Sequence, residues 1–526
     1  MPATLTYPGV YIEEVPSGVR TITGVATSLA AFVGRAARGP VDEPVTISSF
    51  GEFERRFGGL WAKSGLGFAV RDFFQNGGAQ AVIVRVFKSA SQDAAKLERA
   101  GVKLEAISPG TWGNKLRLRV VAVPDPPAAA IAESLGVETD QLFTLIVRDT
   151  ATGEEEMFRN VVVADGPHSV QRAVARQSRL VKVTEATARP SPHAEEPAPG
   201  KTVWDDDDAS SAVATAAAAE PDLEGGNFTG SGTREGKKGL YALEKADIFN
   251  VLCIPPYKAS GAGWEDIQVS IVADAAKYCE DRRALLIVDP PSDWNDKASA
   301  KAHLGDLNSR SKNAAVYFPQ VRQANPLNAG QIETFAPCGA VAGIMARTDG
   351  ARGVWKAPAG LDATISGAAG LTVNLTDADC GELNPLGINC LRSVPASGRV
   401  VWGARTLQGD DRLASEWKYV PVRRLALFIE ESLYRGTQWV VFEPNDEPLW
   451  SQIRLNVGAF MHNLFRQGAF QGQTPRDAYL VKCDKETTTQ NDVNLGIVNI
   501  IVGFAPLKPA EFVIIKIQQL AGQAQT

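Results

Sequence analysis

The chain has 526 residues, of which 44% are hydrophobic and 22% are charged, and it carries a formal net charge of −6. These values are typical of globular material long enough for roughly three domains of about 150 residues each. The negative charge argues against a nucleic-acid coat protein or a polybasic membrane binder, because both need concentrated Lys and Arg.

The apolar stretches are short. The longest, residues 497–507, is far below the 18 or more residues that a membrane-spanning helix needs. The first 16 residues lack the basic and then apolar pattern of a secretory signal, so we expect synthesis in a cytoplasm. Six cysteines occur without any C-x-x-C pair, and we expect them to be buried and reduced: Cys253, Cys279, Cys338, Cys380, Cys390 and Cys483.

Residues 1–27 are extended in character. The stretch TYPGVYIEEVP places strand-forming residues between prolines, which favours a strand or polyproline segment over a helix. No hairpin partner follows nearby in the sequence. We therefore predict an arm rather than part of a compact domain.

Residues 28–87 have an α/β pattern. AAFVG (30–34) reads as a buried strand and SFGEFERRFG (49–58) as a short helix. In residues 64–78 the apolar side chains fall at helical spacing and Gly77-Gly78 can end the helix. AQAVIVRVF (79–87) predicts a second buried strand.

The pattern changes between residues 88 and 240 and then resumes. Residues 110–123 and 141–149 read as exposed-type strands, and residues 189–239 are rich in Pro, Ala, Asp, Gly and Ser, which predicts a flexible or irregular surface segment. Strands and a helix of α/β type return between 241 and 400. Such an interruption predicts a domain inserted into another domain.

Residues 401–509 predict a separate α+β unit. One amphipathic helix, VPVRRLALFIEESLYRG (420–436), precedes a predicted strand QWVVFEP (438–444). Asn445 or Asp446 can cap a second helix that carries Pro448 in its first turn. Three strands follow in the sequence: AYLVKCD (478–484), GIVNIIVGFAP (496–506) and EFVIIKIQQ (511–519). The predicted fold class is therefore α/β and α+β multidomain.

Two features resemble parts of a nucleotide-binding site, but their residues do not fit one. GSGTREGKKG (230–239) is rich in glycine, and the strand LLIVD ends at Asp289. A phosphate-binding loop needs Gly where Ser231 stands and Ser or Thr where Lys238 stands. A solvated loop and an ordinary strand end explain both features, so we predict no cofactor.

Catalytic and metal-binding motifs are likewise missing from the sequence. The four histidines are too far apart for a local ligand motif, and the acidic run 205–208 lacks the alternating spacing and turn glycine of a calcium loop. Neither a G-x-S-x-G elbow nor a catalytic-cysteine signature is found. We predict no catalytic residue, no metal site and no enzymatic activity.

The two ends of the chain share an unusual property. EFVIIKIQQ is apolar on both faces of a strand, yet it follows the last domain, just as YPGVYIEEV precedes the first. We predict that both arms complete sheets of neighbouring copies. This is a heterologous contact, which builds an open helical array unless the rotation between copies closes it. The arm residues are Tyr7, Val10, Tyr11, Ile12 and Val15 at one end, and Glu511, Phe512, Val513, Ile514, Ile515 and Ile517 at the other.

A series of motifs resembles the contractile tail sheath proteins of bacteriophages and of related phage-tail-like injection machines. The matching stretches run in family order: YPGVYIEEVPSG, TSLAAFVGRAARGP, GTWGN, LEGGN, GLYALEKADIFNVLCIP, KAPAG, LNPLGINCLR, VVWGARTL, residues 417–450, GAFQG and PAEF. The C-terminal third is the most specific part. Only about residues 115–235 lack a matching motif, and this stretch corresponds to the family's outward-facing insertion.

The resemblance implies stacked six-fold rings around an inner tube, with interlaced terminal arms and a C-terminal domain that faces the tube. The implied domains are an N-terminal arm (1–27), a core (28–87 and 241–400), an inserted outer domain (88–240), a tube-facing domain (401–509) and a C-terminal arm (510–526). The expected accepting sheet contains Ile497, Val498, Ile500, Val502 and Phe504. Candidate tube contacts are Trp450, Arg454, Asn463 and Arg466, on a helix for which a role in the core is the favoured alternative.

The implied function is contraction that drives the tube through a target envelope. The implied partners are copies of the chain, the inner tube protein, and baseplate and terminator or cap proteins, with no nucleic acid and no membrane insertion. We expect assembly in a bacterial cytoplasm and then residence in a virion tail or injection particle. A non-contractile shell or surface layer and, less in keeping with the motifs, an α/β enzyme stay open as alternatives. Phage, bacteriocin and injection system share these motifs.

Overall fold

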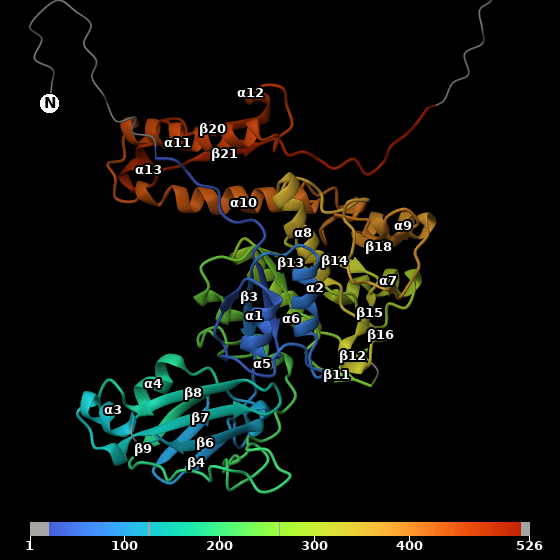
Figure 1. Cartoon of the computed structure of the whole chain (residues 1–526). Coiled ribbons are helices and arrows are strands. Elements are labelled where there is room, and N and C mark those ends of the chain that lie inside the picture. Colours follow the sequence, from blue (N-terminus) through green and yellow to red (C-terminus); the bar gives the residue numbers. More distant parts are fainter. Residues whose placement is uncertain (1–19, 125–126, 262, 517–526) are drawn as a thin grey trace, which may run out of the picture.

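The computed structural model describes residues 20–124, 127–261 and 263–516. Three tiers follow one another along the long direction of the molecule (Figure 1). Two small sheets form one end, a helix-covered parallel sheet forms the middle, and the helices α10 and α11 lie across the other end. The terminal segments leave from this last tier on opposite sides.

The central sheet has eight strands in the order β19-β18-β14-β13-β10-β1-β3-β2. The inner six pair in parallel, and β2 and β19 pair antiparallel at the two edges. The strands are β1 (Ala30–Gly34), β2 (Val45–Ile47), β3 (Ala81–Arg85), β10 (Val251–Cys253), β13 (Leu285–Val288), β14 (Ala314–Phe318), β18 (Ile388–Val394) and β19 (Gly398–Val401).

Helices cover both faces of this sheet, which explains why its strands are continuous apolar runs rather than alternating ones. Phe53, Phe73 and Val341 bring three helices onto one face, and Ile271 brings a fourth onto the other. The helices of this tier are α1 (Phe50–Phe57), α2 (Leu66–Gln75), α5 (Gly225–Thr229), α6 (Val269–Asp281), α7 (Lys297–His303), α8 (Cys338–Arg352) and α9 (Asp377–Leu383). Small strands beside it are β11 (Ala259–Ser260), β12 (Gly263–Trp264), β15 (Val321–Asn325), β16 (Gln331–Phe335) and β17 (Gly370–Leu371).

The chain leaves the central sheet after β3 and returns to it at β10. Residues 94–217 of this interval build two three-stranded sheets around a core of their own, whereas α5 and the residues after it pack on the central sheet. These sheets have the orders β4-β5-β9 and β6-β7-β8. Their elements are β4 (Lys96–Arg99), β5 (Val102–Ala106), β6 (Leu116–Ala122), α3 (Pro127–Leu135), β7 (Phe143–Asp149), β8 (Glu155–Val161), α4 (Val170–Gln177) and β9 (Val181–Ala186).

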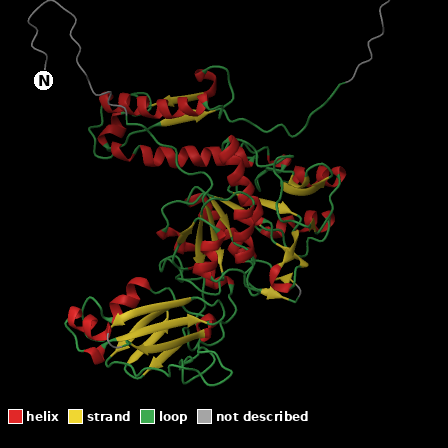
Figure 2. Cartoon of the chain, viewed as in Figure 1, coloured by secondary structure: helices red, strands yellow, loops and turns green. Residues whose placement is uncertain are grey.

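Most of residues 189–239 have no regular structure, as Figure 2 shows by the green loops around these sheets. The segment is nevertheless fixed in part. The buried ring of His193 accepts a hydrogen bond from the Val120 amide at 2.9 Å and contacts the Ser211 hydroxyl at 2.8 Å. These contacts hold the segment against β6, so it is an irregular surface rather than a free loop.

The last tier is built from two long helices and a two-stranded hairpin. Its elements are α10 (Val420–Gly436), α11 (Glu447–Arg466), α12 (Pro475–Ala478), β20 (Tyr479–Lys482), α13 (Gln490–Asn494) and β21 (Ile501–Phe504). The predicted apolar face of α10 is buried at Leu425 and Ile429, and Asp446 caps α11 by accepting from the Glu447 amide at 2.7 Å.

The predicted strand at 438–444 is wrong. Residues Gln438–Val440 form the short 3-10 helix η8, and the chain then turns through Phe442, whose φ is 70°. Val440 and Trp439 pack against the core below α10, which an extended strand at this place would not allow. The other 3-10 helices are η1 (Thr111–Lys115), η2 (Thr139–Gln141), η3 (Gly239–Lys245), η4 (Leu304–Leu307), η5 (Pro326–Asn328), η6 (Asn384–Leu386) and η7 (Asp411–Leu413).

The six cysteines are buried free thiols, as predicted. Among the helices that the structure describes, none combines the length and apolar character needed to cross a bilayer. The described residues also contain no group of His, Cys, Asp and Glu side chains that could hold a metal ion.

Candidate assembly interface

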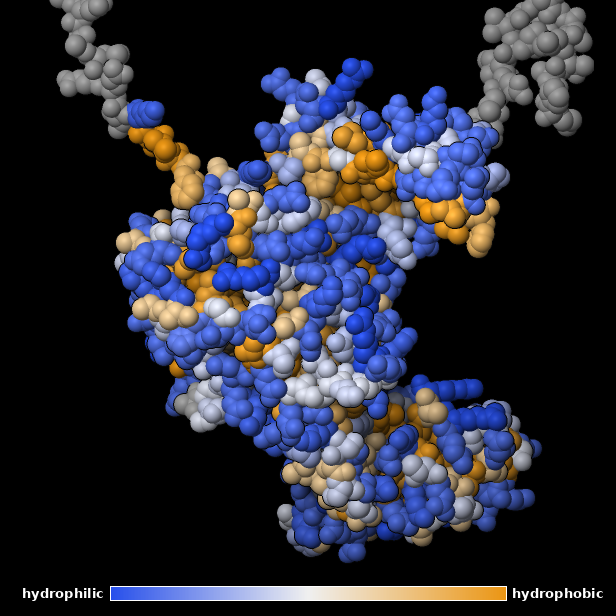
Figure 3. Space-filling view, turned by 180° about the vertical axis from the view of Figure 1, so that it is seen from behind, coloured by the Kyte–Doolittle hydropathy of each residue, from blue (hydrophilic) through white to orange (hydrophobic). Residues whose placement is uncertain are grey.

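The C-terminal segment leaves the molecule as an exposed apolar chain. Phe512, Val513, Ile514 and Ile515 are 76–81% exposed, and residues 511–516 have no strand partner within the described part of the chain. Figure 3 shows these apolar residues in orange, standing clear of the body beside the grey trace at the upper left. A strand former with this exposure is a template for pairing with another molecule.

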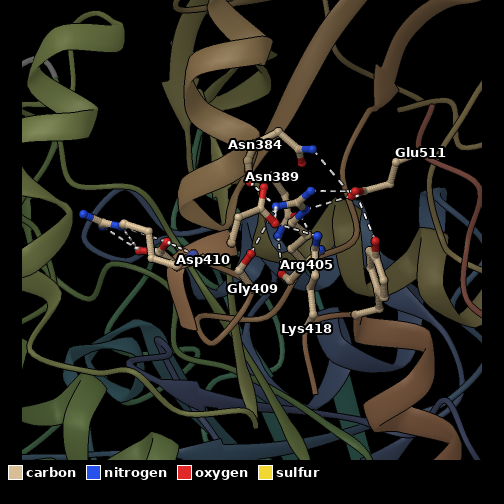
Figure 4. A network of polar contacts seen from close by, with 10 residues as sticks. Asn384, Asn389, Arg405, Gly409, Asp410, Lys418 and Glu511 are labelled. Carbon is tan, nitrogen blue, oxygen red and sulfur yellow. Dashed lines mark hydrogen bonds and ion pairs between the residues drawn. The ribbon is translucent and has the colours of Figure 1, made fainter. Parts of the chain in front are cut away.

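The root of this segment is fixed by one ion pair. The fully buried guanidinium of Arg405 donates from Nε to Glu511 Oε1 at 2.8 Å and from Nη2 to Glu511 Oε2 at 2.6 Å (Figure 4). The Tyr419 hydroxyl donates to the same carboxylate at 3.2 Å. Two parallel bonds between Arg and a carboxylate fix orientation as well as distance.

The rest of the Arg405 guanidinium is also satisfied. Its Nη1 donates to the carbonyls of Asn384 and Gly409, at 2.9 and 3.1 Å, and to Asp411 at 3.0 Å. Asn389 brackets the Arg405 backbone with hydrogen bonds of 2.6 and 2.7 Å. This network comes from β18, η6 and the turn after β19, so the segment is attached to the middle tier.

The charge on Glu511 is stabilised by the same contacts. Burial raises the pKa of Glu511, but the hydrogen bonds and the charge of Arg405 outweigh that effect and hold the pKa below its usual range. The carboxylate is therefore ionised at neutral pH. We call Arg405, Glu511, Asn384 and Tyr419 the arm clamp.

The hairpin of β20 and β21 is the candidate acceptor for a strand. Its register pairs Tyr479 with Phe504 and Lys482 with Ile501. One face packs on the core of α10 and α11 through Val502 and Phe504. In the part of the chain that the structure describes, each strand pairs on one side only, so both outer edges keep free ladder groups.

The expected accepting residues separate into two groups. Val502 and Phe504 lie in β21, whereas Ile497, Val498 and Ile500 precede it and form no strand. The predicted strand is shorter than expected because loop contacts occupy its first backbone groups: the Ile497 carbonyl accepts from Asn445 at 3.0 Å, and its amide donates to the Asp492 carbonyl at 2.8 Å.

The N-terminal arm residues Tyr7, Val10, Tyr11, Ile12 and Val15 lie outside the described residues, as does Ile517 at the other end. The described part, residues 20–27, runs along α10 and α11. The Arg20 amide donates to Asn456 at 3.0 Å, Ile22 is buried in the core, and the Thr27 carbonyl accepts from Arg424 at 2.9 Å. Residue 20, where the described chain begins, thus lies at the end of this tier opposite to the C-terminal segment 507–516 (Figure 1).

The candidate tube contacts on α11 differ in exposure. Asn463 and Arg466 are exposed, and Arg454 is half-buried in an ion pair with Glu447 at 2.6 Å. Trp450 is only 7% exposed, and its indole donates to Asn445 at 2.9 Å within the core. Trp450 therefore stabilises this tier, and its expected contact with another protein is not supported.

The two features that suggested nucleotide chemistry serve local structure. The Gly239 amide of the glycine-rich segment donates to Asp42 at 2.7 Å. Asp289 instead accepts from the Cys338 amide at the start of α8, at 2.8 Å, and burial raises its pKa to about 7.

The arm clamp is the part of the site that the sequence interpretation missed. Arg405 and Glu511 both lie in motifs singled out above, VVWGARTL and PAEF, but 106 positions separate them. The available signal was a single Arg inside an apolar run, which calls for a charged partner when it is buried.

Comparison with known proteins gives two family matches. The phage tail sheath protein central domain family matches residues 231–407, and the phage tail sheath C-terminal domain family matches residues 414–519. The tail sheath protein of Vibrio phage KVP40 is 30% identical over 127 residues, which is 24% of this chain and 18% of that relative. The matched stretch is therefore less than a fifth of the length of this curated relative.

Solved structures share the fold over nearly the whole chain. The helical sheath of the anti-feeding prophage in its contracted state has a TM-score of 0.54 at 22% identity, covering 98% of this chain and 100% of that one. The sheath tail protein of Listeria innocua has a TM-score of 0.58 at 13% identity, covering 93% and 96%. The two family matches span more than half of the 526 residues. The chain belongs to the phage tail sheath protein family, a family of structural proteins.

Proposed function

We propose that this chain is the structural subunit of a contractile sheath, which polymerises as a six-fold helical cylinder around an inner tube and contracts to drive the tube through a target envelope. One observation carries the proposal: the same chain has an exposed apolar C-terminal segment and a hairpin whose two outer edges have no strand partner. The C-terminal segment of each copy can then pair with the hairpin edge of a neighbouring copy. Contacts of this heterologous type build an open helical array unless the rotation between copies closes them into a ring.

The arms supply the connection between copies. Main-chain hydrogen bonds to the hairpin edge stabilise a donated strand by about 0.5–1.5 kcal/mol each. Burial of Phe512, Val513, Ile514 and Ile515 adds roughly 1.5–3 kcal/mol per side chain as an upper range. The N-terminal arm, with Tyr7, Val10, Tyr11, Ile12 and Val15, takes the corresponding role at the other end. Val502 and Phe504 belong to the accepting hairpin.

The domain assignment belongs to the same proposal. Residues 28–87 and 241–400 form the core, 88–240 the outer domain, and 401–509 the tube-facing domain, with arms at 1–27 and 510–526. Arg454, Asn463 and Arg466 are the proposed tube contacts. The further partners are baseplate and terminator or cap proteins. Assembly takes place in a bacterial cytoplasm, and the assembled protein is then part of a virion tail or an injection particle.

The energy for contraction comes from a difference in packing between two arrangements of the lattice. An extended array is metastable, and a trigger at the baseplate releases it into a shorter and more stable one. This mechanism needs no nucleotide. The arms keep the copies connected while the domains move.

The experiment is negative-stain microscopy of the full-length chain and of two matched deletions. Removal of residues 512–526 leaves Glu511 in the arm clamp but takes away the donated strand, and we expect soluble monomers. Removal of residues 518–526 keeps that strand and is expected to leave hollow cylinders. Deletion of residues 1–16 is expected to abolish cylinders in the same way as the longer C-terminal deletion.

Normal cylinders after removal of 512–526 or 1–16 would contradict the arm assignment. Flat sheets or closed shells from the full-length chain, with no cylinders, would support a non-contractile lattice instead. Hydrolysis of a nucleotide by the purified chain would support the enzyme alternative.

A further inference from the structure

Phe442 stands out on the surface of the last tier. Its side chain is fully exposed, that of Val441 beside it is 63% exposed, and the φ of Phe442 is 70°. A bulky residue in the left-handed region is strained, and such residues cluster where function requires the conformation. Phe442 thus combines a strained backbone conformation with an apolar ring that is exposed to water.

The base of this projection is packed against the body of the last tier. Trp439 and Val440 pack against the core, and the guanidinium of Arg20 lies 4.7 Å from the centre of the Trp439 ring. The Glu443 amide donates to the Val440 carbonyl at 3.1 Å, which closes the turn that carries Phe442. We call Val441 and Phe442 the knob.

The surroundings of the knob are acidic. Glu443 directly follows the knob, Asp446 lies four positions after Phe442, and both are exposed. Within the described ranges, no cationic side chain lies within 4.0 Å of either carboxylate, whereas Glu447 pairs with Arg454. The knob is therefore an apolar tip beside two unpaired negative charges.

A pocket of about 940 Å³ lies at the opposite end of α11, under the root of the C-terminal arm. Its apolar lining includes Trp355, Trp402, Leu507 and Phe512. Arg352, Lys356 and Lys508 also line it, and in the part of the chain that the structure describes none of them has a carboxylate within 4.0 Å. Asp377 and Glu511 also line the pocket, but they are paired with Arg392 and Arg405, so the unpaired charges of the pocket are positive where those beside the knob are negative.

One chain cannot bring its own knob to its own pocket. Asp446 caps the first turn of α11, and Gln467 and Gly468, just after its last turn, line the pocket. The 20 residues of α11 span about 30 Å at 1.5 Å per residue. Figure 1 shows the start of α11 at one side of the tier and the C-terminal arm leaving at the other. Knob and pocket are therefore suited to a contact between two copies.

We infer that the knob of one copy inserts into this pocket of the next copy, with Glu443 and Asp446 facing Lys508 and Arg352. The inference rests on the proposed function, because it needs an array of copies. It adds a contact distinct from strand donation, because the pocket keeps Trp355, Trp402 and Leu507 as its apolar walls when Phe512 is donated to a neighbour. Burial of a rigid aromatic anchor in such a pocket is the usual source of most of the binding energy of an interface.

The first test compares cylinder yield of full-length variants by sedimentation and microscopy. Phe442→Gly relieves the backbone conformation, so the monomer is expected to fold at least as stably, while the yield falls at least about ten-fold, as for loss of an interface anchor. Leu327→Ala, at another exposed apolar residue that lies in the middle tier, is the matched control and is expected to keep the yield. An unchanged yield for Phe442→Gly would overturn the inference.

The second test identifies the partner surface. Glu443→Lys and Lys508→Glu are each expected to lower the yield, and the double variant is expected to recover it. Oxidation of assembled Phe442→Cys/Leu507→Cys protein is expected to give a ladder of covalent oligomers, and Phe442→Cys/Leu327→Cys is expected to give none. Assembled cylinders without a ladder in the first pair would place the knob elsewhere and refute the contact. A wild-type chain that forms no cylinders would instead refute the proposed function, and this contact with it.

Discussion

Arg405 and Glu511 form a bidentate ion pair in which the guanidinium is fully buried and the carboxylate is 15% exposed. The pair joins the turn after β19 to the segment after β21, across 106 positions of sequence. It lies where the C-terminal chain leaves the folded body, so it fixes the direction in which the exposed residues after Glu511 point.

Glu511→Gln is expected to destabilise the arm root by about 1–3 kcal/mol, because the amide cannot balance the buried charge of Arg405. Asp411 remains as a weaker partner at 3.0 Å, which keeps the loss below that of a fully unpaired charge. Urea unfolding and hydrogen exchange of residues 505–516 measure the effect. Glu416→Gln, at an exposed side chain, is the control; equal protection in both variants would contradict the role of the clamp.

The arm clamp is also expected to weaken in acid. The pKa of Glu511 lies below its ordinary value in the folded chain, so its contribution is complete above the unfolded value of about 4.3 and is lost as the pH falls through the folded value. The difference in unfolding free energy between wild type and Glu511→Gln should therefore be constant from pH 8 to 5 and shrink below pH 4. A difference that grew on acidification would show that the sign is wrong.

The contribution of Asp289 to stability is expected to change with pH in the opposite direction to that of Glu511. Burial raises its pKa to about 7, and its Oδ2 is buried without a hydrogen-bond partner among the described residues. The folded chain then holds an extra proton between about pH 4 and 7, so its stability falls as the pH rises through that interval. Asp289→Asn should gain about 1–3 kcal/mol over wild type at pH 8 and nothing at pH 4. Asp362→Asn, at an exposed carboxylate, should show no such trend.

The buried pair of Arg424 and Asp349 joins α10 to α8 with bonds of 2.9 and 2.6 Å, and both side chains are 3% exposed. Asp349→Ala is expected to cost about 3–5 kcal/mol, because it leaves a buried charge unpaired. The double variant Arg424→Met/Asp349→Leu is expected to recover most of that loss. Thermal and urea unfolding of the full chain would reveal whether the double variant is instead the less stable of the two.

The fold could be predicted where periodicity was strong. The apolar stripes of α10 and α11 repeat at helical spacing, and the strands of the central sheet are unbroken apolar runs, so their places in the sequence agree with the structure. The run QWVVFEP has the composition of a strand and fails as one, because the packing of Trp439 and the left-handed backbone of Phe442 require a turn.

The site could be predicted only where a single stretch carries the signal. The exposed residues Phe512 to Ile515 were identified from their own sequence. The bond between Arg405 and Glu511 depends on how distant segments meet, and no local pattern encodes it. The knob at Phe442 could not be predicted for the same reason. Its role depends on the exposure of its side chain and on its backbone geometry, and amino-acid composition specifies neither.

The position of Glu511 along the chain has a mechanical consequence. Glu511 lies along the chain between β21 and the residues that follow Glu511. Tension applied to those residues therefore reaches the Arg405 guanidinium before it reaches β21. The load is passed into the central eight-stranded sheet through β18 and β19, whereas the short hairpin of β20 and β21 is shielded from it. A pull on residues 512–516 would therefore move the central tier without separating β20 from β21.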